Sequence, residues 1–380
     1  MSKKEAQTVV LVANTSWYLY NFRLPLLKSL KEKGFDVITI TPKDEYTDRL
    51  ISNGFIHYHI PIDRRGLALL SNFITIFSFL SLYCHIKPKM IIHFTIKPVI
   101  FGTLTARFCT KAKIVNNVTG LGYIFIGKTF LHKILKPFVR WMYWCVLRLS
   151  DLLIFQNEAD RDFFIKSKII TEKIPPSILI SGSGVDLDRF RRKNVKNKKS
   201  EVNFILIARM LYDKGIQEYI EAAKIVKRTF KNAIFYLVGD IDKGNPSAIS
   251  SETINTWRQQ GIVNYCGKVD DVVTFLENAD VFVLPSYREG LSRSIIEAMA
   301  MELPIITTDV PGCRETVIEK ENGLLVRPNN VPDLVQAMIF MINNPDKRLK
   351  MGKKSRLIAQ DKFDVQQINQ LYLSYLEQLC

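Results

Sequence analysis

The sequence has 380 residues, of which 47% are hydrophobic and 24% are charged. A chain of this length and composition can form two domains with buried cores, which excludes a largely disordered protein. The formal net charge is +16. Residues 1–185 contain 25 Lys and Arg against 12 Asp and Glu, a net charge of +13, whereas residues 186–380 carry only +3. The basic first half favours a nucleic acid, a phosphorylated ligand or an anionic lipid as partner over a merely soluble surface.

The cysteines and the start of the chain indicate the compartment. Six cysteines are spread along the sequence without a CxxC pair or the spacing of metal ligands, which favours reduced thiols in a cytoplasmic protein. The opening "MSKKEAQTVVLVAN" runs directly into a strand pattern, so we expect no signal peptide. The triplets DLD at 186–188 and DID at 240–242 resemble DxD metal motifs, but we expect no metal at either.

In the first half of the chain, apolar runs typical of strands alternate with helical stretches such as residues 23–34. Residues 66–85 carry no charge and approach the length of a membrane span, but Ser, Thr and Asn interrupt the segment. We therefore expect a buried or interfacial helix there, between two strands. The predicted strands are 8–14, 36–42, 90–96, 112–119, 152–158 and 177–184.

The second half repeats this alternation, with helices expected at 215–230 and 271–279. Continuous apolar strands alternating with helices predict parallel sheets covered on both faces, so the fold class is α/β with two doubly wound domains. The predicted strands are 202–208, 233–240, 262–267, 281–286, 304–309 and 323–328. A polar, basic linker near 181–202 separates the domains. We place them at 1–183 and 184–361, with an amphipathic helix at 362–380 that returns to the first domain.

Ligands of open α/β sheets bind beyond the carboxyl ends of the strands, and two such domains facing each other create a cleft. In "FILIARMLYDKG", Arg209 follows a strand, and Lys214 precedes a helix. Two cations beside a helix N-terminus predict an anion site. A pair of solvated surface cations is the alternative.

The stretch "REGLSRSIIEAMA" places Glu289 at the end of another strand and Glu297 in the second turn of the next helix. The Glu297 side chain leans back toward the helix N-terminus, so both carboxylates can face one ligand held there. Carboxylates accept hydrogen bonds from the vicinal hydroxyls of sugars and repel phosphate. The pattern therefore indicates a phosphate flanked by two polyols, with an ordinary charged helix face as the alternative.

Taken together, these motifs resemble the retaining family-4 glycosyltransferases of the GT-B fold, which has two Rossmann-like domains. "EGLSRSIIE" is similar to their E-x7-E motif, "ARMLYDKG" to their diphosphate site, and "SGVD" to their interdomain segment. "HFTIKPVIFG", "NNVTGLGYIF" and "VGDIDKGNPSAIS" resemble the subgroup that builds lipid-linked oligosaccharides, including bacterial N-acetylgalactosaminyltransferases. The resemblance covers nearly the whole chain.

The resemblance implies a role for each matching residue. Glu297 would hold the donor ribose, Arg209 and Lys214 the diphosphate, and Glu289 the transferred sugar, with these last three forming the catalytic set. Further donor-side residues would be Gly184, Asp240, Val269, Gly290, Leu291, Ser292 and Ile296. On the acceptor or sugar side we expect Asn14, Arg23, His93, Lys97, Thr119 and Gly120. Neither a cofactor nor a metal is expected, because the cations and the helix dipole neutralise the leaving group.

The implied function is transfer of a hexose or N-acetylhexosamine from a UDP-sugar to a polyprenyl-diphosphate-linked saccharide in bacterial surface polysaccharide assembly. Two departures stand out: the loop after the first strand, "ANTSWYLYNFRLP", is not glycine-rich, and Thr119-Gly120 replaces a His-Gly of many relatives. A nucleotide-sugar epimerase or hydrolase, or a basic nucleic-acid-binding protein, are the alternatives. The donor sugar, the linkage, the acceptor glycan and the oligomeric state stay open.

The segment 125–148 mixes Lys and Arg with Phe, Trp and Tyr. Such a helix can lie in the headgroup plane of a bilayer with its aromatic side chains inward. We therefore expect peripheral binding to an anionic membrane, on the cytoplasmic face of the inner membrane, and no binding to nucleic acid.

Overall fold

The structure is a computed structural model that describes residues 7–63, 69–120, 130–193, 201–242 and 244–379. The chain divides into two compact units, Met1–Ser183 with Gln366–Cys380, and Gly184–Val365. Each unit is built around one parallel β-sheet, which confirms the predicted α/β class.

The sheet of the first unit has seven strands in the order β3-β2-β1-β4-β5-β6-β7. All six predicted runs are strands. The edge strand β3 was not among them, because its short, partly exposed sequence IHYH lacks a continuous apolar run. The strands are β1 (Thr8–Val12), β2 (Asp36–Thr41), β3 (Ile56–His59), β4 (Met90–Phe94), β5 (Lys113–Val118), β6 (Leu152–Phe155) and β7 (Ser177–Leu179).

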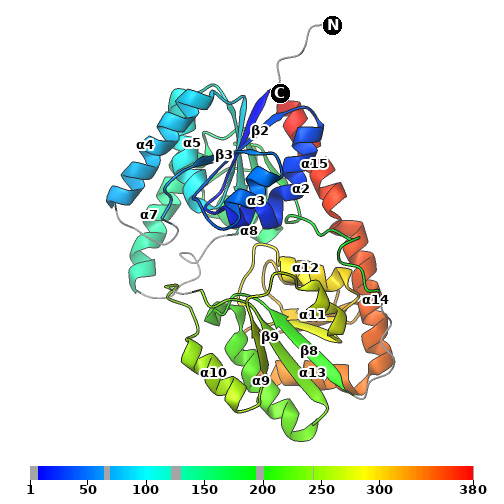
Figure 1. Cartoon of the computed structure of the whole chain (residues 1–380). Coiled ribbons are helices and arrows are strands. Elements are labelled where there is room, and N and C mark those ends of the chain that lie inside the picture. Colours follow the sequence, from blue (N-terminus) through cyan, green and yellow to red (C-terminus); the bar gives the residue numbers. More distant parts are fainter. Residues whose placement is uncertain (1–6, 64–68, 121–129, 194–200, 243, 380) are drawn as a thin grey trace. The chain divides into compact units, whose positions relative to one another are not determined.

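Helices cover both faces of this sheet (Figure 1). Alternate side chains of β1 enter different cores: Val9 and Leu11 pack with α2 and α15, whereas Val10 and Val12 pack with α4 and α5. The helical elements are α1 (Ser16–Tyr18), η1 (Leu19–Arg23), α2 (Leu24–Glu32), α3 (Thr47–Ser52), α4 (Leu69–Ile86), η2 (Pro98–Gly102), α5 (Thr103–Cys109), α7 (Phe130–Leu147), α8 (Glu158–Lys166) and α15 (Val365–Leu379).

The C-terminal helix α15 belongs to the first unit although it follows the second unit in the sequence. Its residues Ile368, Tyr372, Leu373 and Leu376 are buried in the same core as the leucines of α2. They recur at the spacing of a helix face, as the amphipathic pattern predicted. The second unit extends to Val365, slightly beyond the expected boundary at 361.

The second unit has a six-stranded parallel sheet in the order β10-β9-β8-β11-β12-β13, and all six predicted runs form its strands. They are β8 (Val202–Ile207), β9 (Ala233–Val238), β10 (Asn264–Gly267), β11 (Val281–Leu284), β12 (Ile305–Thr308) and β13 (Gly323–Val326). The helical elements are η3 (Tyr212–Lys214), α9 (Ile216–Thr229), α10 (Ser251–Gln259), α11 (Val273–Asn278), α12 (Arg293–Ala300), η4 (Arg314–Thr316), α13 (Val331–Asn343) and α14 (Pro345–Lys362). Residues 194–200 of the expected linker lie outside the described residues.

Helix α4 accounts for the uncharged segment expected at 66–85, whose first three residues lie outside the described part of the chain. Among the described residues, no helix is long and apolar enough to cross a membrane. Phe79 and Tyr83 are buried against the sheet, whereas Phe73 and Phe77 are more than half exposed. The expected helix between two strands is therefore confirmed, and it is buried on one face only.

A buried polar network joins α4 to the sheet. His93 on β4 is fully buried, and its two ring nitrogens lie 2.8 Å from the Tyr83 hydroxyl and 2.9 Å from Asn116 Oδ1. The Asn116 amide donates in turn to Thr103 and Ser150. Burial lowers the pKa of His93 to about 4, so the ring is neutral at pH 7.

This network predicts a stability that depends on pH. The pKa of His93 is about 4 in the folded protein and about 6.5 in the unfolded chain. The unfolded chain therefore binds the extra proton first as the pH falls. The stabilisation of the folded protein by neutral His93 is therefore fully present above pH 6.5. It is lost as the pH falls toward 4, and the free energy of unfolding decreases by about 3 kcal/mol in total.

Urea denaturation at pH 7 and pH 4.5 measures this loss. The variant His93→Gln should lose less stability between the two pH values than the wild type does. His85→Gln, which changes an exposed histidine of α4, should behave as the wild type. An unchanged pH dependence in His93→Gln would contradict the assignment.

Candidate functional site

The predicted donor residues of the second unit converge at the carboxyl ends of three neighbouring strands. Strand β11 pairs with β8 on one side and with β12 on the other. Arg209 follows β8, Glu289 follows β11, and Gly312 follows β12. Because parallel strands end at the same edge of the sheet, these three connections are adjacent.

An ion pair joins two of the connections. Lys214 Nζ lies 2.6 Å from Glu289 Oε1, and both side chains are only 14% exposed. Lys214 ends the short helix η3, and Gly215 then turns into α9 with a φ of +70°. A Cβ at Gly215 would lie 2.0 Å from the Pro285 carbonyl oxygen, so only glycine allows this close approach.

Arg209 shortly precedes Lys214 in the sequence but pairs with a different carboxylate. Its guanidinium contacts Asp242 at 2.7 Å, and the arginine side chain stays 50% exposed. The second aspartate of the DID triplet therefore orients a cation, while the first, Asp240, is exposed. Among the described residues, no three His, Cys, Asp or Glu side chains gather in a way that could hold a metal ion.

Helix α12 presents its N-terminus at the same edge. Ser292 is the N-cap residue, but its side chain makes no cap hydrogen bond to the first turn. Glu297 accepts a hydrogen bond from Arg293 Nε at 2.8 Å, and its side chain is 13% exposed. Burial raises the pKa of Glu297, an effect that the charge of Arg293 partly offsets. The helix thus combines a positive dipole end with a shielded carboxylate.

The loop after β12 braces the Glu289 loop. The Glu289 N–H donates to the Pro311 carbonyl at 3.1 Å, and the Ser292 N–H donates to the Gly312 carbonyl at 3.2 Å. Gly312 has a φ of +83°, and a Cβ there would lie 2.2 Å from the Glu289 carbonyl oxygen. Sequence reasoning missed this loop, although the Pro-Gly pair in "DVPGC" is a recognisable turn signal.

Three further charged side chains were also missed. Arg293 could have been found from its i, i+4 spacing to Glu297. Arg189 and Asp271 form an ion pair at 3.1 Å, and their charges act on Glu297. They are distant in sequence, so only the fold brings them together.

Buried Cys313 and partly buried Tyr287 lie next to Glu289 and help to fix its loop. Burial and the charge of Glu289 raise the pKa of the Cys313 thiol to about 12, so Cys313 is neutral at pH 7. The Tyr287 hydroxyl donates to Glu218 of α9 at 2.6 Å. The loop is therefore attached to α9 as well as to the β12 connection.

Some expected donor residues have structural positions instead. The side chain of Ile296 is 1% exposed and lies in the core of the second unit, so its expected contact with a ligand is wrong for the side chain. Gly184 packs so closely on Val365 that a Cβ would lie 2.6 Å from its Cα. Val269 and Leu291 are partly buried against the same core. Gly290 is partly exposed between Glu289 and α12.

The expected acceptor residues of the first unit divide into two groups. Asn14 follows β1, and Thr119-Gly120 follows β5; these residues are partly exposed, and their strands flank β4. Lys97 follows β4, and its ammonium donates to Asn72 of α4 at 2.8 Å. The carboxyl edge of this sheet thus gathers Asn14, Lys97 and the Thr119-Gly120 pair.

Arg23 and His93 do not present their side chains at that edge. Arg23 is 1% exposed, and its guanidinium lies 4.6 Å from the Phe94 ring and 5.2 Å from the Tyr372 ring. His93 is enclosed in the polar network described above. In this arrangement neither side chain can contact an acceptor, so both expectations are corrected to structural roles.

Comparison with known proteins gives the family. Residues 187–357 match the family described as Glycosyl transferases group 1, and residues 8–157 match Glycosyl transferase 4-like. A relative from Campylobacter jejuni, N,N'-diacetylbacillosaminyl-diphospho-undecaprenol alpha-1,3-N-acetylgalactosaminyltransferase, is 30% identical over 95% of this chain and 96% of its own length. The chain belongs to the family-4 glycosyltransferases.

Two further similarities concern this glycosyltransferase. The Escherichia coli UDP-Gal:alpha-D-GlcNAc-diphosphoundecaprenol alpha-1,3-galactosyltransferase is 22% identical over 87% of this chain and 89% of its own. The sucrose-phosphate synthase of Thermosynechococcus elongatus superposes with a TM-score of 0.82 at 19% identity, covering 98% of this chain and 99% of its own. The structural likeness confirms the GT-B fold predicted from the sequence.

The close approach at Gly312 generates a prediction for this glycosyltransferase. Gly312→Ala should destabilise the protein more than Gly261→Ala. Both glycines have positive φ, which costs a residue with a Cβ about 1–2 kcal/mol. A Cβ at Gly261 would meet nothing within 4 Å, whereas at Gly312 it would also collide with the Glu289 backbone.

Urea denaturation of the two variants measures the difference. Equal losses of unfolding free energy would contradict the proposed bracing of the Glu289 loop by Gly312.

Proposed function

We propose that this glycosyltransferase transfers a hexose or N-acetylhexosamine from a UDP-sugar to a saccharide linked to undecaprenyl diphosphate, with retention of configuration. The observation that carries the proposal is the convergence of Arg209, the Lys214–Glu289 pair and the N-terminus of α12 at one sheet edge. Two cations and a helix dipole suit a diphosphate, and two flanking carboxylates suit sugar hydroxyls.

The acceptor class is supported by the relatives. Two relatives with coverage of most of the chain are named for substrates with a diphospho-undecaprenol group, and one of them is named for UDP-Gal as donor. The place of such an enzyme is the assembly of bacterial surface polysaccharide. Membership in the glycosyltransferase family does not favour the alternatives of an epimerase or a nucleic-acid-binding protein.

The proposed reaction follows from these positions. The bond between the sugar C1 and the UDP oxygen breaks, and the acceptor hydroxyl oxygen bonds to C1 on the same face of the ring. The acceptor proton passes to the departing diphosphate oxygen. Arg209, Lys214 and the α12 dipole stabilise the negative charge that develops on that diphosphate, which requires no cofactor in this scheme.

In this scheme the two carboxylates have different tasks. Glu297, fixed by Arg293, accepts hydrogen bonds from the ribose hydroxyls, and Glu289, fixed by Lys214, accepts them from the transferred sugar. A panel of UDP- and GDP-sugars with lipid-diphosphate monosaccharide acceptors, read by product mass, tests the whole proposal. No transfer product with any UDP-sugar would overturn it.

The cation assignment predicts that Arg209→Ala and Lys214→Ala each weaken UDP binding about tenfold to a hundredfold, because a hydrogen bond to a charged group contributes roughly 1.5–3 kcal/mol. Isothermal titration calorimetry with UDP measures the loss. Arg228→Ala is the matched control, since it removes an exposed cation from the last turn of α9, the helix that begins beside Lys214. UDP affinities within twofold of the wild type in both variants would remove the diphosphate assignment.

The carboxylate assignment predicts two different defects. Glu297→Ala should weaken UDP itself, because UDP contains the ribose. Glu289→Ala should leave UDP affinity nearly intact and reduce transfer. Calorimetry and a turnover assay on the same preparations separate the two effects, and equal loss of UDP affinity in both variants would refute the division.

Acidification provides a second readout for Glu297. Because burial raises its pKa, protonation begins at a higher pH than for an ordinary glutamate. UDP affinity of the wild type should therefore fall on acidification. In Glu297→Gln, that part of the pH dependence should be absent.

A further inference from the structure

Helix α4 has the reverse of the usual arrangement for a surface helix: its solvent face is apolar. Large hydrophobic side chains recur along this face at the spacing of one helix stripe. They are Leu70 (74% exposed), Phe73 (56%), Ile74 (49%), Phe77 (65%) and Leu80 (36%). We call these five residues the α4 stripe. A contiguous apolar stripe of this kind marks an interaction surface.

The opposite face of α4 is firmly attached to the first unit. Phe79 and Tyr83 are fully buried in the core, and Tyr83 bonds to His93. Thr75 donates to the Pro61 carbonyl, and Asn72 accepts from Lys97. Leaving the sheet would break all of these contacts, so α4 presents its stripe as a fixed surface.

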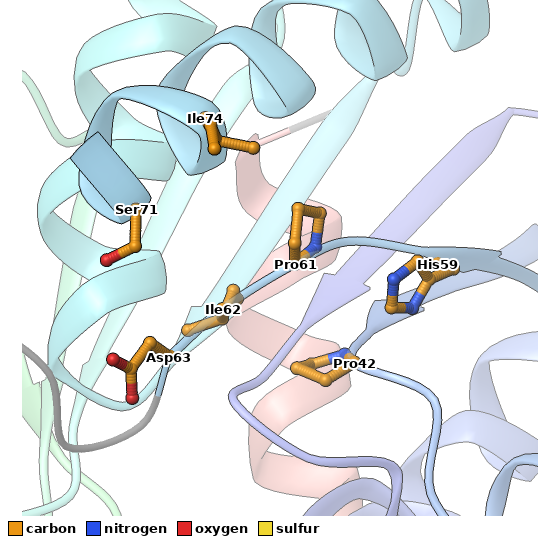
Figure 2. Close-up of a pocket in the computed structure, with 7 residues that line it drawn as sticks. All are labelled: Pro42, His59, Pro61, Ile62, Asp63, Ser71 and Ile74. Atoms are coloured by element: carbon orange, nitrogen blue, oxygen red, sulfur yellow. The ribbon is translucent and has the colours of Figure 1, made fainter.

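The Ser78 hydroxyl, next to the stripe, is satisfied within the protein. Ser78 donates its hydroxyl to the Ile74 carbonyl at 2.8 Å, one helical turn earlier. The apolar area also continues past α4, because Ile74 lines a groove of about 290 Å³ whose other apolar lining residues are Pro42, Pro61 and Ile62 (Figure 2). The polar members of the lining are His59, Asp63 and Ser71. The stripe is therefore part of a broader apolar surface.

The neighbouring helices extend this surface and add aromatic rings. Helix α4 packs against α5, and α5 packs against α7. Phe108 of α5 is 82% exposed, and on α7 Phe138, Trp141 and Trp144 are each more than 40% exposed. Exposed tryptophans next to aliphatic and phenyl groups are typical of proteins that lie at the membrane–water interface.

Charge identifies the partner. Residues 64–150, which span all three helices, contain 13 Lys and Arg and no Asp or Glu. On α7, Arg148 lies over the Trp144 ring at 4.5 Å, so a cation accompanies an exposed aromatic side chain. Acidic side chains flank this range at Asp63 and at Asp151, which pairs with Arg107 and Lys113, so the charge of the surface is predominantly positive. A surface that joins apolar groups with predominantly positive charge complements a bilayer with anionic headgroups.

We propose that the α4 stripe inserts into the headgroup region of an anionic bilayer and that the basic residues of this region hold the first unit on its surface. This inference goes beyond the proposed function, since it does not depend on the donor or on the reaction. It extends the expectation that the segment 125–148 of the first domain lies in the headgroup plane; residues 125–129 of that segment lie outside the described residues.

Insertion differs from purely electrostatic adsorption in its response to salt. Salt screens the attraction between charges, with a Debye length of about 8 Å at physiological ionic strength, but it does not weaken the burial of apolar groups. Binding should therefore decrease when salt is raised without being abolished. Anionic lipid should increase binding at low salt.

Co-sedimentation with vesicles tests the proposal. Vesicles of phosphatidylcholine, alone and mixed with phosphatidylglycerol, are incubated with the wild type and with a Phe73→Gln, Phe77→Gln double variant. We expect the double variant to bind mixed vesicles at least about tenfold more weakly. The matched control is Leu349→Gln with Leu357→Gln, which removes two leucines, each 59% exposed, from α14 of the second unit and should bind as the wild type.

Each other outcome overturns the proposal. Wild-type binding by the double variant would show that the stripe does not insert, and complete release at high salt would show that charge alone holds the protein. A wild-type dimer in sedimentation velocity without lipid, dissociated by the same variant while vesicle binding persists, would make a second copy of the chain the partner. Unchanged melting temperature and UDP affinity in the double variant verify its fold and separate this test from that of the proposed function.

Discussion

The ion pair between Lys214 and Glu289 is the interaction on which the candidate donor site depends. It joins the connections after two neighbouring strands, and both side chains are largely withdrawn from water. Withdrawing two charges from water is costly, and removal of one partner leaves the other uncompensated. The surrounding structure maintains this arrangement: Gly215 lets the Lys214 turn approach Pro285, and the Gly312 loop holds the Glu289 backbone.

Two other charged groups of the candidate donor site are also held by ion pairs. Arg209 is oriented by Asp242, and Glu297 is oriented by Arg293. Each of these four charged groups, Arg209, Lys214, Glu289 and Glu297, thus has a partner of opposite charge that fixes its position. Positions fixed in advance reduce the reorganisation that ligand binding requires. The site is consequently a set of paired charges around a helix N-terminus.

The first unit is organised differently. Its buried side includes polar and charged groups, such as His93 and Arg23, while the exposed side of α4 is apolar. His93 is tolerated because both of its ring nitrogens are hydrogen-bonded, and the Arg23 guanidinium lies against the Phe94 and Tyr372 rings. They attach α4 and α15 to the sheet, which leaves the outer face of α4 available for a partner.

The sequence by itself determined the α/β class, all the strands with continuous apolar runs, and the residues at the strand ends that form the candidate site. These features depend on local periodicity and on the rule that parallel strands end at one edge. The edge strand β3 was missed because its sequence is short and partly polar. The sequence also did not show that the Ile296 side chain faces the core. Successive residues of a helix point in different directions, so the direct sequence neighbour of a site residue can lie on the buried face of the helix.

Only the tertiary structure decided which charges pair and which helix faces are exposed. Arg209 with Asp242 and Lys214 with Glu289 are separated by many residues, and the sheet order brings them together. An apolar helix such as α4 has the same sequence pattern whether its surroundings are protein or lipid. Its exposed face became evident only when packing showed which side the sheet covers, because burial is a property of the neighbours and not of the residue.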